Sequence, residues 1–112
     1  MSTQDDSQRR RIVELVTRAE AIVEGMETAT LDGCWAMTAF GRYRLCALLG
    51  IMPYGIYEGS VEADPVALLE EAVAIADALE VSLEELSWRL ALGDALRTAA
   101  ADIRMVRDAR DV

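Results

Sequence analysis

The chain has 112 residues, the size of one domain, and its 11 basic and 20 acidic residues give a formal charge of −9. It has no histidine, which excludes Ser–His and Cys–His catalysis, imidazole metal sites and a histidine pH switch. No apolar run reaches the roughly 18 residues of a membrane span, and the polar start is not a secretory signal. We therefore expect one cytoplasmic domain over 1–112, away from membranes, with frayed ends at 1–5 and 108–112.

The first expected helix covers residues 4–27. Its apolar residues recur every three or four positions and form one stripe, whereas the opposite side carries charged residues that include Glu20. The stripe is deep for a domain of this size, so we expect part of it to pack against a second copy in a homodimer. The residues expected at this self-association surface are Ile12, Leu15, Ala19, Ile22 and Met26.

A turn at residues 28–33 is expected to precede a second helix over 34–49. Gly41 in its middle costs about 1 kcal/mol relative to alanine, unless close helix packing needs the gap. Cys34 and Cys46 lie in this segment, and we expect free thiols because two cysteines provide neither a disulfide framework nor a zinc site.

The glycine-rich composition of residues 50–64 predicts one long internal loop. Its tyrosines, Tyr54 and Tyr57, are expected either to pack on the helices or to contact a partner.

A third helix is expected over 65–80, because Asp64 can cap its start and Pro65 suits its first position. Apolar residues lie nearly all round this segment, which is typical of a central helix. The capping-box spacing of Ser82 and Glu85 predicts a last helix from there to about residue 108, with Gly93 as a kink or a close contact. The four helices predict an all-α fold, either a four-helix bundle or an orthogonal helical domain.

Charge is unevenly distributed along the chain. Residues 61–88 contain eight acidic residues and no basic residue, for a sum of −8. Such a segment repels phosphate, which argues against nucleic acid, and suits a basic partner or a divalent cation, although an acidic face can also serve only solubility. The candidate partner-binding residues are Glu70, Glu71, Asp77, Glu80, Glu84 and Glu85.

The segment IADALEVSLEEL, residues 75–86, resembles the part of Cro/CI-type helix-turn-helix domains that joins the fourth and fifth helices. Residues 40–45 resemble the opening helix of that family, so the resemblance covers about 40–86. It implies a relative of transcription regulators. The stretch that corresponds to the recognition helix holds glycine, proline and acids, without the arginines that DNA reading requires.

A second resemblance is to the all-α MazG-type nucleotide pyrophosphohydrolases, carried by residues 68–72 and 92–96. It implies Mg²⁺ held by Glu70, Glu71 and Asp94. Two further acids of that family's pattern are replaced here by Ala74 and Ala91.

The sequence as a whole predicts a small acidic helical module that regulates or inhibits a protein partner by covering a basic surface. We expect no catalytic residue, metal or cofactor. The alternatives are a helix-turn-helix regulator and a Mg²⁺-dependent MazG-like hydrolase.

Overall fold

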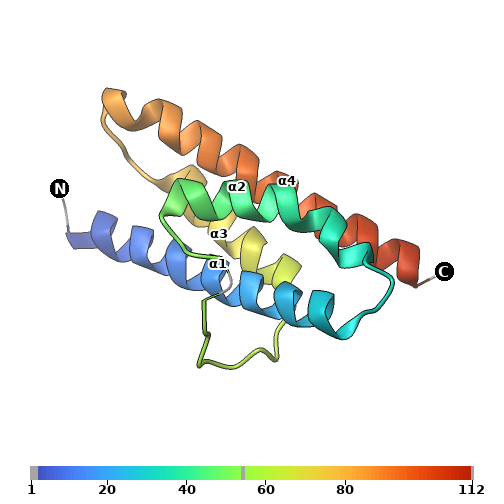
Figure 1. Ribbon diagram of the computed structural model, residues 1–112. Helices are drawn as coiled ribbons and strands as arrows, with labels where there is room; N and C mark the ends of the chain where they lie inside the picture. The colour runs from blue at the N-terminus through green and yellow to red at the C-terminus, as the bar shows by residue number, and fades with distance from the viewer. Residues whose placement is uncertain (1–2, 54, 112) are drawn as a thin grey trace.

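The computed structural model of the chain describes residues 3–53 and 55–111, and within these ranges it contains helices and no strand (Figure 1). This confirms the all-α prediction, in the form of a helical bundle. No helix in the described ranges is long and apolar enough to cross a membrane. The elements are α1 (Thr3–Ala29), η1 (Cys34–Thr38), α2 (Ala39–Leu49), α3 (Pro65–Ala78), η2 (Leu83–Glu85) and α4 (Leu86–Arg110), where η denotes a 3₁₀ helix.

The long loop follows from the order of the helices. α1 packs chiefly on α3, α3 on α4, and α2 on α4. Figure 1 shows that α2 and α3 run in the same direction, both antiparallel to α1 and α4. The chain must therefore return along the bundle between α2 and α3, and the described residues of this connection, 51–53 and 55–64, pass beside α1 (Figure 1).

The apolar stripe of α1 forms much of the core. Ile12, Leu15, Ala19 and Ile22 are buried, and Met26 packs half-buried beside them. The residues expected to meet a second copy thus pack inside their own chain, where α1 lies against α3. The central position expected for α3 is confirmed, since its residues pack against both α1 and α4.

The expected helix over 34–49 consists of two pieces, η1 and then α2. α2 ends at Leu49 and is followed by its C-cap residue, Gly50, which adopts a left-handed conformation with φ of +69°. Gly41 is a close-packing site, because a Cβ atom built there would lie 2.8 Å from Oδ2 of Asp102 in α4. The glycine thus allows α2 to approach α4 closely.

The start of α3 is confirmed: Oδ1 of Asp64 accepts a hydrogen bond from the backbone N–H of Val66 at 2.9 Å. The prediction of a capping box at Ser82 is wrong, because the Ser82 side chain makes no capping hydrogen bond. Instead, the backbone N–H of Glu85 donates to the Ser82 carbonyl at 3.0 Å, closing a 3₁₀ turn before α4 begins. α4 then continues through Gly93 without a break.

Candidate functional site

The acidic residues predicted to bind a partner fall into two groups. Four form ion pairs with arginines of α1 and α4 that flank them: Glu70 with Arg104, Glu71 with Arg11 at 3.0 Å, Asp77 with Arg97, and Glu85 with Arg9 at 2.9 Å. These pairs are largely exposed, so each adds at most about 1 kcal/mol to stability. Their main consequence is that much of the acidic charge is neutralised within the chain.

Glu80 and Glu84 form the second group. Both are exposed, and neither has an ion-pair partner in the described chain. They flank the turn between α3 and α4, on either side of Leu83, whose exposed fraction is 88%. Leu86 and Leu90 follow at helical spacing and are also exposed, at 36% and 61%. We refer to Glu80, Leu83, Glu84, Leu86 and Leu90 as the acidic corner.

The backbone of the acidic corner is held from several directions. Nη1 of Arg89 donates to the carbonyls of Asp77 at 3.1 Å and Leu79 at 3.3 Å, which supplies the end of α3 with donors. Leu79 itself is buried. Nε1 of Trp88 donates to the Leu48 carbonyl at 3.0 Å, and the guanidinium of Arg9 lies 4.9 Å from the Trp88 ring centroid. The exposed leucines therefore project from a well-anchored turn.

Of the two tyrosines predicted to pack on the helices or to contact a partner, the structure describes Tyr57. Tyr54 lies outside the described residues. Tyr57 is half-buried against Gly59 and separates two hollows of about 380 and 400 Å³, one along residues 11–18 of α1 and one along 21–29. The loop is attached to α1 through Arg18, which donates to the carbonyls of Ser60 at 2.8 Å and Glu62 at 3.3 Å.

The alternative magnesium site is not assembled. Glu70 and Glu71 bind different arginines, and Asp94 pairs with Arg44 at 2.9 Å. Among the described residues, no three acidic or cysteine side chains come together in a way that could hold a metal ion. The reason is positional, because side chains of Glu70 and Glu71 diverge on α3 while Asp94 faces α2 rather than α3.

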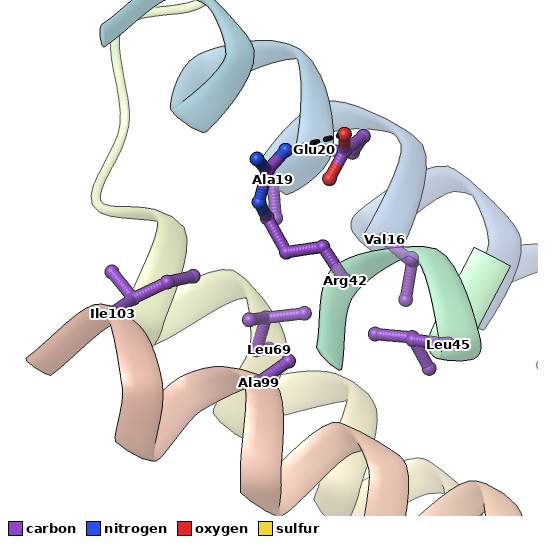
Figure 2. A pocket seen from close by; sticks show the side chains of 8 residues that line it. All are labelled: Val16, Ala19, Glu20, Arg42, Leu45, Leu69, Ala99 and Ile103. Atoms are coloured by element: carbon purple, nitrogen blue, oxygen red, sulfur yellow. Dashed lines mark hydrogen bonds and ion pairs between the residues drawn. The ribbon is translucent and has the colours of Figure 1, made fainter. Parts of the chain in front are cut away.

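Sequence reasoning missed a buried charge network between α1 and α2. Glu20 was expected on the solvent side of α1, but it is 7% exposed, and Nη1 of Arg42 donates to its carboxylate at 2.6 Å (Figure 2). Arg42 also pairs with Glu27, and its Nε donates to the Thr38 hydroxyl at 2.9 Å. The available signal was that Arg42 and Arg44 are the charged residues of an otherwise largely apolar helix, although the sequence does not show which of them is buried.

Burial controls the ionisation of this network. Desolvation raises the pKa of Glu20, and the attraction of Arg42 offsets only part of that rise. The pKa of Cys46 is raised to about 11, mainly by burial and further by Glu20, so this thiol is unreactive at neutral pH. Both cysteines are free thiols in the described chain, as expected.

The space beside the Glu20–Arg42 pair is too small for a ligand. The cavity there measures about 10 Å³, at the lower limit for one water molecule, and its other walls are apolar (Figure 2). The network therefore fixes how α1 and α2 pack and offers no binding volume.

No protein-family model, curated protein or solved structure matches the chain. The resemblances to helix-turn-helix regulators and to MazG-type enzymes stay predictions. Among the described residues, Glu80 and Glu84 of the acidic corner are the predicted partner-binding acids that are both exposed and without an ion-pair partner.

Proposed function

We propose that the protein is a binding module that acts by placing its acidic corner on a basic, partly apolar surface of a protein partner. The observation that carries this proposal is the position of Glu80 and Glu84. They are exposed, have no ion-pair partner in the described chain, and lie on either side of exposed Leu83, with exposed Leu86 and Leu90 following in α4. An inhibitor or regulator of this kind works by covering the partner's surface.

The two kinds of side chain supply different parts of the binding free energy. Burying Leu83, Leu86 and Leu90 removes apolar surface from water, at about 25 cal/mol per Å². Glu80 and Glu84 steer association and select a basic surface more than they add affinity. The acids that already bind arginines contribute less, because a partner would have to replace an existing ion pair.

The test compares two variants with the same charge change at different places. E80R/E84R reverses the acidic corner, whereas E58R/E62R reverses two exposed acids of the long loop that also lack ion-pair partners in the described chain. Each tagged protein is incubated at low salt with native lysate treated with nuclease, and the retained proteins are identified by mass spectrometry.

We expect one stoichiometric partner on the wild type and on E58R/E62R, and its loss on E80R/E84R. Equal retention by both variants would place the contact elsewhere. Retention that requires intact nucleic acid would refute the proposal and favour the helix-turn-helix alternative. With the purified partner, the association rate should fall as salt rises.

A further inference from the structure

The exposed leucines of the acidic corner follow one side of the chain. Leu83 lies in η2, Leu86 begins α4, and Leu90 follows one turn later. Side chains three apart in a 3₁₀ helix lie above one another, and side chains four apart in an α-helix are neighbours. The three leucines, exposed by 88%, 36% and 61%, therefore form one stripe, which we call the leucine ridge.

The two ends of the leucine ridge differ in charge. Glu80 and Glu84 lie at its first end, and neither has an ion-pair partner in the described chain. Two turns beyond Leu90, on the same side of α4, Arg97 pairs with Asp77 and leaves the other end neutral. From the start of α4 to this pair the length is about 16 Å, or about three turns of helix.

The backbone at the acidic corner restricts the kind of partner element that fits. The described ranges contain no strand, so they offer no sheet edge to which an extended segment could add. The carbonyls of Asp77 and Leu79 already accept hydrogen bonds from Arg89. A polyproline segment needs a groove lined by aromatic rings, whereas Trp88 is half-buried with Arg9 over its ring. A ridge of leucines instead matches the side of another helix, where apolar residues recur every three or four positions.

We propose that the partner presents an amphipathic helix that packs antiparallel to the start of α4, with arginine or lysine in its last turn. This rests on the proposed function, because it names the part of the partner that meets the acidic corner. Apolar side chains at helical spacing would pack on the leucine ridge, and the basic side chains would meet Glu80 and Glu84.

The antiparallel direction follows from the charges. It brings the C-terminal end of the partner helix to the acidic end of the leucine ridge. Basic side chains in the last turn are favoured by the dipole of their own helix, whereas in the first turn of a parallel helix they would oppose it.

Three fluorescent peptides of identical composition and about 18 residues, long enough to form a helix, test this inference. The first carries leucines at helical spacing and two arginines in its last turn. The second moves the arginines to the first turn, and the third alternates leucines with polar residues, as in a strand. Fluorescence anisotropy at low salt measures their affinity for the untagged full chain. We expect the first peptide to bind about threefold more tightly than the second and at least about tenfold more tightly than the third.

Variants of the chain show whether the first peptide binds at the acidic corner. E80R/E84R should weaken its binding at least about tenfold. L83S/L90S, which changes two exposed leucines and leaves the core intact, should weaken it at least about fivefold. E58R/E62R is the matched control and should bind like the wild type.

The outcomes separate this inference from the proposed function. No binding of the first peptide, equal binding of the first and third, or binding that E80R/E84R leaves unchanged would overturn the helical partner. Where the lysate experiment nevertheless retains a partner that depends on Glu80 and Glu84, the proposed function stands and the class of partner element is wrong. Tighter binding of the second peptide than of the first would overturn the antiparallel direction.

Discussion

Replacing Arg42 with methionine removes the cation from the buried network between α1 and α2. Arg42 and Glu20 are 3% and 7% exposed, and their side chains are joined at 2.6 Å. Methionine fills a similar volume but donates no hydrogen bond, so the Glu20 carboxylate would stay buried without its donor. Removing one partner of a buried ion pair costs about 3–5 kcal/mol. A domain of 112 residues has about 6–17 kcal/mol of stability in total, so R42M should fold with much reduced stability.

Urea unfolding followed by far-UV circular dichroism measures this loss. The exposed pair of Arg11 with Glu71 supplies the control, since R11M should change the unfolding free energy by less than about 1 kcal/mol. A loss of less than about 1 kcal/mol for R42M at neutral pH would refute the reasoning, because the buried carboxylate would then tolerate the absence of its donor.

The pH dependence gives a second check with a definite sign. Burial already raises the native pKa of Glu20 above its ordinary value of 4.5, and without Arg42 it must rise further. For a carboxyl whose native pKa is raised, stability is greatest below the unfolded pKa and declines as pH rises through the native value. The deficit of R42M relative to the wild type should therefore shrink as pH falls from neutral to mildly acidic. A deficit independent of pH would point to lost packing instead.

Three further outcomes follow from the geometry of single residues. D64A should lower the unfolding free energy by about 1 kcal/mol through loss of the α3 cap, whereas D64N, which can still cap, should lose less in the same urea titration; equal losses would contradict the capping role. G50A should cost about 1 kcal/mol in thermal melts, because alanine disfavours a φ of +69°, and an unchanged melting temperature would contradict that strain. A thiol reagent at mildly alkaline pH should label Cys34 in the folded chain and Cys46 only after unfolding, since burial raises the pKa of Cys46 to about 11; rapid labelling of both would show that the α1–α2 seam opens.

The elements that the sequence predicted well are those specified by local chemistry. The stripe of α1 and the Asp64–Pro65 start of α3 depend on residues within a few turns of each other, so they are readable without the fold. The 3₁₀ turns before α2 and α4 were missed because backbone hydrogen bonds form them. At the second of these turns, the Ser82 carbonyl accepts the hydrogen bond from the Glu85 N–H that the Ser82 hydroxyl was expected to accept.

The buried network was missed because it depends on helix order. Glu20 lies at the edge of the α1 stripe, where periodicity assigns it equally to core or solvent. The burial of Glu20 depends on Arg42, which reaches it because α2 packs beside α1. α2 does not pack beside α3 in the described chain. Nothing in the local pattern of either helix indicates that pairing.

The same reasoning limits what a run of charge says about a surface. Residues 61–88 sum to −8, yet arginines far away in the sequence, such as Arg11 and Arg104, bind the acids of α3. A partner that met the whole acidic segment would associate at a rate falling steeply with salt, whereas one that meets Glu80 and Glu84 should show a shallow dependence. The steepness of that dependence therefore reports how many acids face the partner. A steep dependence would mean that the intrachain pairs open on binding and that the acidic corner is only part of the interface.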